Sequence, residues 1–209
     1  MAKRKELGRR DPATRRQAIM DAALAVFAAQ GFVATKLDDV AEKAGVAKGT
    51  IYLHFKDKET LFEEIVRAAV APVIARLESV VQLPDLPTEM VLGTMFELLR
   101  TQVLGTDRKL VLRLVLTEGP RFPRIAEFYH REVISRGMRL IGGLLRRAAS
   151  RGELASPGIA EYPQLVIAPL LLAVVWDSMF ARIEPLDFES LFAVHRSALL
   201  AGSRTGGTP

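Results

Sequence analysis

The side chains best suited to contact nucleic acid occur between residues 35 and 61, in the run TKLDDVAEKAGVAKGTIYLHFKDKETL. Reading a duplex requires polar side chains at the start of a helix that enters the major groove, with phosphate contacts on either side. Lys48 can reach a base acceptor or a phosphate, and Gly49 permits close approach of the backbone. Hydroxyl groups follow within the same helix, and further polar groups flank it. The candidate DNA-contacting residues are Thr35, Lys48, Gly49, Thr50, Tyr52, His54 and Lys58.

Several residues of this segment also have a purely structural interpretation. Tyr52 could pack on Phe55, and His54 could cap the end of its helix. Ile51, Leu53 and Phe55 are expected in the core. The type of residue alone leaves these alternatives open.

Two short helices joined by a turn must position these side chains. Thr35, with Asp38 three residues later, is typical of a helix start, because the threonine oxygen can accept from free backbone N–H groups. Gly45 is expected to end the first helix, where a positive φ is needed. The apolar residues of the first helix recur on one face: Leu37, Val40, Ala41 and Ala44. This spacing predicts a helix-turn-helix.

The run LDDVAEKAGVAKGTIYLHFKDKETLF, which ends at Phe62, resembles the tetracycline-repressor (TetR) family of bacterial transcription regulators. The resemblance covers about the first 65 residues. It implies an N-terminal helix-turn-helix domain and a C-terminal domain that binds an effector and dimerises. Ala47 departs from the family pattern, which often has serine as the cap of the second helix, and a missing cap typically costs roughly 0.5–2 kcal/mol.

The positive charge is concentrated at the N-terminus. The chain of 209 residues has a net charge of +5, and residues 1–16 contain seven basic and two acidic residues, 7 − 2 = +5, so the remainder sums to zero. A basic block beside a helix-turn-helix suits phosphate contact. A solvated tail that aids solubility is the alternative interpretation.

The composition argues against a catalytic or metal site. The chain has no cysteine and three histidines without metal-binding spacing, and it contains no phosphate-binding loop or nucleophile motif. We therefore expect no enzyme activity, no metal and no cofactor. Because no N-terminal run resembles a secretion signal, we expect a cytoplasmic protein without membrane association.

Helical spacing extends over the whole chain and predicts an all-α protein of about nine helices. Asp11, Asp57 and Asp187 are each expected to open a helix, and Gly31 is expected to end the first one. One long helix is expected from about residue 124 to residue 149.

We expect a basic flexible arm at residues 1–10, a helix-turn-helix DNA-binding domain at 11–57, a helical ligand-binding and dimerisation domain at 58–203, and a disordered tail at 204–209. Residues 105–152 contain eleven bases and four acids. A solvated helix face with partner acids elsewhere explains this excess better than a second nucleic-acid surface.

The C-terminal part contains aromatic and polar residues that could line an effector pocket, although residues at such spacing are more often ordinary core. The candidates for the pocket are Phe96, Arg113, Phe122, Tyr129, Trp176 and Phe180. Leu165 to Trp176 contains no charged or polar residue, yet it is shorter than the roughly 20 residues that a membrane span needs. We expect this helix and the last helix to form the dimer interface, with Leu165, Leu172, Val175 and Phe192 as candidate contacts.

Together these features predict a homodimeric repressor that binds double-stranded operator DNA and is released by a small, largely apolar effector. The alternative is a DNA-binding protein of the same fold without a small-molecule effector, controlled by a protein partner or used architecturally. The sequence leaves open the effector, the operator, and whether the protein represses or activates.

Overall fold

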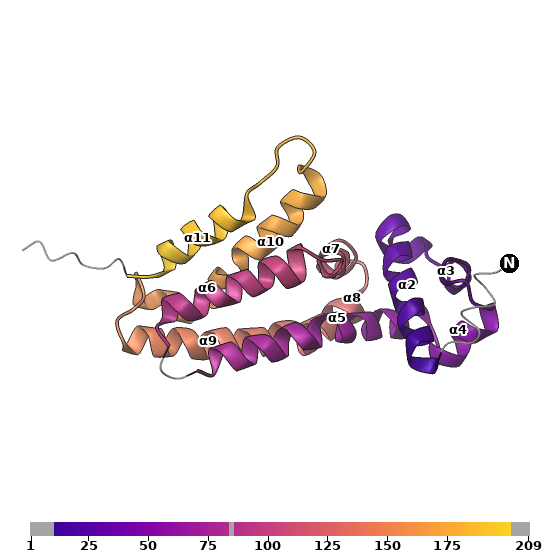
Figure 1. Cartoon of the computed structure of the whole chain (residues 1–209), viewed down its shortest axis with the longest axis horizontal. Helices are drawn as coiled ribbons and strands as arrows, with labels where there is room; N and C mark the ends of the chain where they lie inside the picture. The colour runs from indigo at the N-terminus through magenta and orange to yellow at the C-terminus, as the bar shows by residue number, and fades with distance from the viewer. Residues whose placement is uncertain (1–10, 84–85, 202–209) are drawn as a thin grey trace, which may run out of the picture. The chain divides into compact units, whose positions relative to one another are not determined.

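The computed structural model describes residues 11–83 and 86–201, which are almost entirely helical (Figure 1). The proposed arm at 1–10 and the proposed tail at 204–209 lie outside the described residues. The helices are α2 (Pro12–Ala34), α3 (Leu37–Ala44), α4 (Lys48–His54), α5 (Lys58–Val81), α6 (Thr88–Leu99), α7 (Arg108–Glu118), α8 (Pro123–Tyr129), α9 (Ser135–Ser150), α10 (Gln164–Met179) and α11 (Phe188–Leu199). The predicted all-α fold is confirmed.

The described residues form two compact units. The first contains the described residues up to Val70 together with Leu110–His130, and the second contains Ala71–Lys109 together with the described residues from Arg131 onward. Helices α5 and α7 therefore contribute to both units. The segment 110–130, distant in sequence from the helix-turn-helix, packs in the same unit as that motif.

The predicted helix starts at three acidic residues are confirmed. The Asp11 carboxylate accepts from the backbone of Ala13 at 2.9 Å, and Pro12 occupies the first helical position. Asp57 accepts from the Thr60 backbone at 2.7 Å, and Asp187 accepts in the same way at the start of α11. Side-chain caps thus fix where α2, α5 and α11 begin.

An aromatic cluster forms the centre of the first unit. The rings of Phe27 and Phe32 stack with centroids 5.2 Å apart, and both contact Phe62 of α5 edge to face. Phe122, which precedes α8, lies 5.0 Å from Phe32. In addition, Arg113 of α7 donates to the carbonyl of Ala28 at 2.9 Å. These contacts attach the segment 110–130 to α2.

Three glycines have the positive φ that other residues rarely adopt, and two of them shape the first unit. Gly45 ends α3 in the left-handed region, with φ 69° and ψ 26°, as predicted. Gly31, with φ 80° and ψ 166°, interrupts α2 three residues before its end. Helical geometry is therefore broken at Gly31, the residue at which the sequence predicts the end of the first helix.

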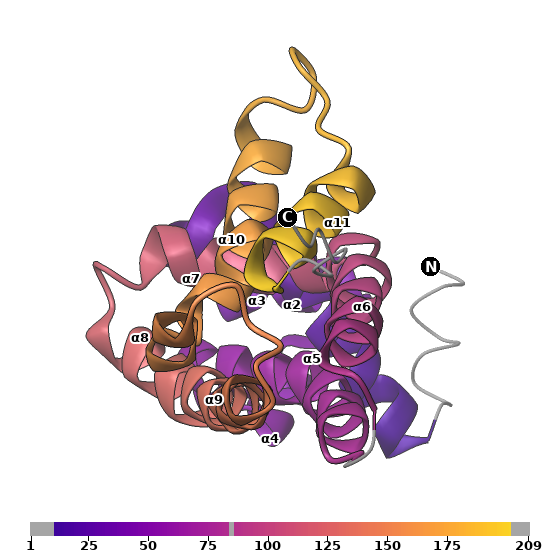
Figure 2. The ribbon, with the colours of Figure 1, turned by 90° about the vertical axis from the view of Figure 1, so that its left-hand side faces the viewer.

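In the second unit, α11 lies beside α6 and α10 (Figure 2). The helices deviate from ideal geometry in two places, where π-helical segments follow α6 (Arg100–Leu104) and α8 (His130–Ile134). Because α8, the second π segment and α9 follow one another without a break, they correspond to the single long helix expected between residues 124 and 149.

One described helix, α2, is long and apolar enough to cross a membrane by length and composition, since it has 23 residues and contains an 18-residue stretch with a mean hydropathy of 1.4. Its residues Ile19, Ala23 and Phe27 are fully buried inside the first unit. The core helix of a folded domain meets the same criterion, so the length and hydropathy of α2 are weak evidence for a membrane span.

Candidate nucleic-acid interface

Helix α4 presents one buried and one exposed face. Ile51 is fully buried, and Phe55, which follows the helix, is almost so. On the other face Tyr52 is 58% exposed and Leu53 is 85% exposed. The prediction that Leu53 belongs to the core is therefore wrong. Leu53 follows Ile51 by two residues, which is about 200° around an α-helix, so it faces away from the side that Ile51 buries.

Lys48 lies in the first turn of α4 and points toward α3. Its Nζ donates to the Asp38 carboxylate at 2.6 Å, and its side chain remains 70% exposed. The hydrogen bond to Asp38 raises the pKa of Lys48, so the ammonium stays fully charged at neutral pH. Exposed ion pairs of this kind contribute only about 0–1 kcal/mol. Lys48 can thus exchange Asp38 for another anion at little cost.

The N-terminus of α4 lacks a side-chain cap. Ala47 occupies the cap position with φ −70° and ψ 146°, and it offers no side-chain acceptor. Gly49, two residues after Ala47, has open space beside its Cα, since a Cβ built on it would meet no atom within 4 Å. The fold therefore does not require glycine at this position, whereas close approach of a duplex backbone would.

Two residues that the sequence predicts to contact phosphates have polar partners within the protein. Lys58 Nζ donates to the carbonyls of Phe32 at 2.7 Å, Val33 at 3.0 Å and Thr35 at 3.4 Å. It also lies 4.8 Å from the centroid of the Phe32 ring. These contacts fasten the first turn of α5 to the junction between α2 and α3.

Thr35 is also turned inward. The residue is only 2% exposed, and its hydroxyl donates to the carbonyl of Gly31 at 2.7 Å. It does not cap α3, because the cap position belongs to Lys36, whose backbone N–H donates to Asp39 at 3.2 Å. The predicted helix start is therefore displaced by one residue, and Thr35 occupies the C-terminal cap of α2. Its contact with DNA stays a prediction.

The remaining candidates, Thr50 and His54, are half-buried. The ring of His54 lies 6.2 Å from that of Phe55. Their contact with DNA stays a prediction. The structure thus brings Lys48, Gly49, Tyr52 and Leu53 together as an exposed surface on one short helix.

The six candidate pocket residues do not gather in one described cavity. Arg113, Phe122 and Tyr129 belong to the first unit, where burial raises the pKa of Tyr129 to about 12. Phe96, Trp176 and Phe180 belong to the second unit. There the indole N–H of Trp176 donates to the carbonyl of Glu184 at 2.7 Å, and its ring contacts Phe180 edge to face. Of the six, Phe96 lines the cavity described below.

The candidate dimer residues differ in exposure. Leu165, Leu172 and Val175 are between 38% and 46% exposed, although they are large and apolar. Phe192 is buried against Phe96, with ring centroids 5.3 Å apart. It therefore belongs to the core of the second unit and not to an exposed face.

Intramolecular partners account for several of the basic residues between 105 and 152. Arg136 pairs with Glu78, Lys109 pairs with Asp177, and Arg147 donates to the carbonyl of Val81. These pairings match the interpretation of a solvated helix face with acids elsewhere. Among the residues that the structure describes, no three His, Asp or Glu side chains come together in a way that could hold a metal ion.

Comparison with known proteins places this helix-turn-helix in a family. The model of the family described as "Bacterial regulatory proteins, tetR family" matches residues 19–65. The HTH-type transcriptional repressor BepR of Brucella suis is 32% identical over 171 residues, which cover 79% of this chain and 78% of BepR. The chain belongs to the TetR family.

Other relatives match over shorter spans. The HTH-type transcriptional regulator AcrR of Shigella flexneri is 35% identical over 101 residues, 48% of this chain and 47% of AcrR. The repressor KstR2 of Mycolicibacterium smegmatis is 34% identical over 82 residues, 39% of this chain and 40% of KstR2. These two alignments therefore span less than half of each relative.

Solved structures of transcriptional regulators share the fold. The transcriptional regulator FadR from Bacillus subtilis, solved in complex with stearoyl-CoA, has a TM-score of 0.72 at 22% identity, over 89% of this chain and 98% of that one. KstR2 of Mycobacterium tuberculosis has a TM-score of 0.71 at 19% identity, over 90% and 96% of the two chains. At this level of identity the likeness concerns the fold alone.

Proposed function

We propose that this TetR-family chain is a homodimeric repressor that binds operator DNA through α4 and is released by a small, largely apolar effector. The observation that carries the DNA-binding part is the exposed face of α4. The exposed side chains of α4 are Lys48, Tyr52 and Leu53. Ile51 lies on the opposite face of this helix and is buried in the core. Side chains in the first turns of such a helix can reach base edges in the major groove.

The proposed contacts divide into base-reading and phosphate-binding groups. Lys48 and the hydroxyls of Thr50 and Tyr52 are assigned to base edges, and Leu53 adds an apolar surface that suits a thymine methyl group. His54 is assigned to a phosphate. Thr35 and Lys58 are assigned to positioning, because their polar groups are bonded to backbone carbonyls.

The apolar surface of α10 supports a dimer. Five exposed apolar residues of this helix recur every three and four positions, which is the spacing of a coiled-coil seam: Leu165, Ala168, Leu172, Val175 and Met179. Leu171 beside them is also exposed. Exposure of such an apolar row to water is unfavourable, and packing against α10 of a second copy of the chain would bury it. Two copies of α10 and α11 would form a four-helix bundle and supply the two reading helices that a symmetric operator needs.

We assign residues 11–57 to DNA binding and residues 58–203 to effector binding and dimerisation. The segment 110–130 is assigned to the effector part, yet it packs on α2 through Arg113 and Phe122. Movement of α7 would therefore be transmitted to the first helix of the DNA-binding part. An effector that favours one arrangement by 1–3 kcal/mol would change operator affinity by about 5–150-fold.

Operator selection tests this function. Duplexes selected from a random library should bind the wild-type protein about 10³-fold or more tightly than scrambled duplexes at the same salt concentration. Leu172→Arg should dissociate the dimer and abolish this binding, as measured by sedimentation and fluorescence anisotropy. Met90→Arg is the matched control, because Met90 is also exposed and apolar but lies on α6. A wild-type protein that enriches no sequence, or a Leu172→Arg dimer that binds normally, would contradict the proposal.

A further inference from the structure

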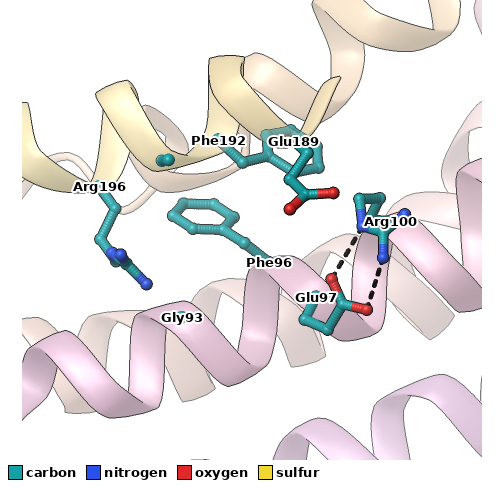
Figure 3. A pocket seen from close by; sticks show the side chains of 8 residues that line it. Gly93, Phe96, Glu97, Arg100, Glu189, Phe192 and Arg196 are labelled. Atoms are coloured by element: carbon teal, nitrogen blue, oxygen red, sulfur yellow. Dashed lines mark hydrogen bonds and ion pairs between the residues drawn. The ribbon is translucent and has the colours of Figure 1, made fainter. Parts of the chain in front are cut away.

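We propose that a groove between α6 and α11 binds a small organic carboxylate with an apolar body. This proposal rests on the proposed function in one respect, since it names the place and the chemical class of the effector. The groove has a volume of about 270 Å³ and lies wholly within the second unit (Figure 3). Three of its lining residues come from α6, Arg100 comes from the π-helical segment that follows α6, and four come from α11.

The centre of the groove is apolar. Phe96 of α6 and Phe192 of α11 stack with their ring planes 19° apart, and both are almost fully buried. His195 contacts the edge of Phe96 at 5.9 Å, and its Nε2 lies 2.8 Å from the carbonyl of Leu165, which holds the ring in place. The aromatic pair therefore gives the groove fixed walls and a small apolar strip that a ring or short chain of a ligand can cover.

Arg196 supplies a positive charge at one end. Its Nε is buried and has no hydrogen-bond partner among the described residues. A buried donor without an acceptor is unfavourable, and for a guanidinium the natural acceptor is a carboxylate. Figure 3 shows the side chain on one side of Phe96, whereas the other charged residues lie on the opposite side.

Gly93 makes the position of Arg196 possible. A Cβ on Gly93 would lie 2.5 Å from Arg196 Nη1, so the guanidinium occupies the space that a side chain at residue 93 would fill. Gly93 lies inside α6, where glycine is less favourable than alanine. Its presence there fits a requirement to seat the guanidinium on the helix.

The opposite end of the groove discourages a second anion. Arg100 is held by two hydrogen bonds to Glu97, of 2.8 and 2.7 Å, and so has its charge matched. Glu189 of α11 adds another carboxylate at the same end (Figure 3). A ligand with one carboxylate would therefore bind with that group at Arg196 and its apolar body across the phenylalanine pair.

The volume limits the ligand to a small molecule. At about 30 Å³ for each water molecule of the liquid, the groove has room for roughly nine waters, which accommodates a single ring or a short chain with a carboxylate. Benzoate is a suitable probe, and benzamide is its neutral counterpart of nearly the same shape.

Calorimetric titration of the full chain, without DNA, tests the site directly. Benzoate should bind, and benzamide should bind about tenfold or more weakly, because it cannot supply the charged acceptor. Arg196→Met should weaken benzoate binding by a similar factor. Gly93→Ala should do the same by displacing the guanidinium, while its thermal midpoint stays at or above that of the wild type. Arg182→Met, which removes an exposed arginine outside the groove, should bind benzoate as the wild type does.

A second titration, with the selected operator, tests the effector role. Benzoate should weaken operator binding by the wild type and by Arg182→Met, but not by Arg196→Met. Benzoate that fails to bind, or that binds Arg196→Met and Gly93→Ala normally, overturns the site, while operator selection still decides the proposed function separately. Benzoate that binds at Arg196 without weakening operator binding overturns the effector assignment and leaves the DNA-binding proposal intact.

Discussion

Helix α4 and the first turn of α5 are adjacent in sequence, and both contain a lysine predicted to contact DNA, yet they are built in opposite ways. Helix α4 begins at Ala47 without a side-chain cap and exposes Lys48 to solvent. The start of α5 is capped by Asp57, and Lys58 is bonded to three backbone carbonyls. The difference indicates that one part of the motif is free to engage a duplex and the other keeps it in position.

The largest effect is expected from substitution of Lys58, whose ammonium group is bonded to backbone carbonyls. Lys58→Met would remove the three hydrogen bonds from the ammonium group, so unfolding free energy should fall by about 1.5–3 kcal/mol. Affinity for operator and random duplexes should fall by the same factor, because a displaced motif loses all contacts together. Chemical denaturation and anisotropy measure the two effects.

Lys56→Met is the matched control for this variant, since Lys56 is an exposed lysine two residues before Lys58, in the connection between α4 and α5. It should leave stability unchanged. Equal stability of Lys58→Met and Lys56→Met would remove the distinction between the two regions.

A smaller effect of opposite sign is expected at the uncapped helix. Ala47→Ser adds an acceptor at a cap position that already has extended geometry, so the protein should gain about 0.5–2 kcal/mol of unfolding free energy. Hydrogen exchange of the first α4 amides should slow accordingly. Unchanged exchange would mean that the missing cap does not loosen this helix.

The smallest effect is expected from the acidic partner of Lys48. Asp38→Asn removes the ion pair, and because exposed pairs contribute at most about 1 kcal/mol, duplex affinity should rise no more than about fivefold. A fall in affinity would show that Asp38 places Lys48 for DNA rather than competing with DNA for it. Anisotropy at one fixed salt concentration distinguishes these results.

The sequence predicted the helices better than the side-chain environments. Caps and glycines act on neighbouring residues, so Asp11, Gly45, Asp57 and Asp187 were sufficient to locate helix ends. The inward turn of Lys58 depends on carbonyls more than twenty residues away, and the charge of a lysine gives no indication of it. Likewise, Leu53 resembles a core residue until Ile51 is seen to occupy the inner side of α4.

The candidate pocket shows the same limit over longer distances. Its aromatic residues were chosen by type and helical spacing, but packing distributes them over two units. Arg196 was not among the candidates, because its significance depends on Gly93, about one hundred residues earlier in the chain. Only tertiary structure brings those two residues together.

The most direct test of the central claim compares Lys48→Ala, Tyr52→Ala and Leu53→Ala with Lys58→Met for binding to a selected operator and to a scrambled duplex at one salt concentration. Each α4 variant should lose specific binding by about 1–3 kcal/mol for a base contact while random binding changes less, so the specific-to-random ratio falls. Lys58→Met should leave that ratio unchanged. All variants must keep the wild-type oligomeric state, and the α4 variants the wild-type thermal midpoint as well. If the α4 variants keep the wild-type ratio, α4 does not read the operator and the account is contradicted.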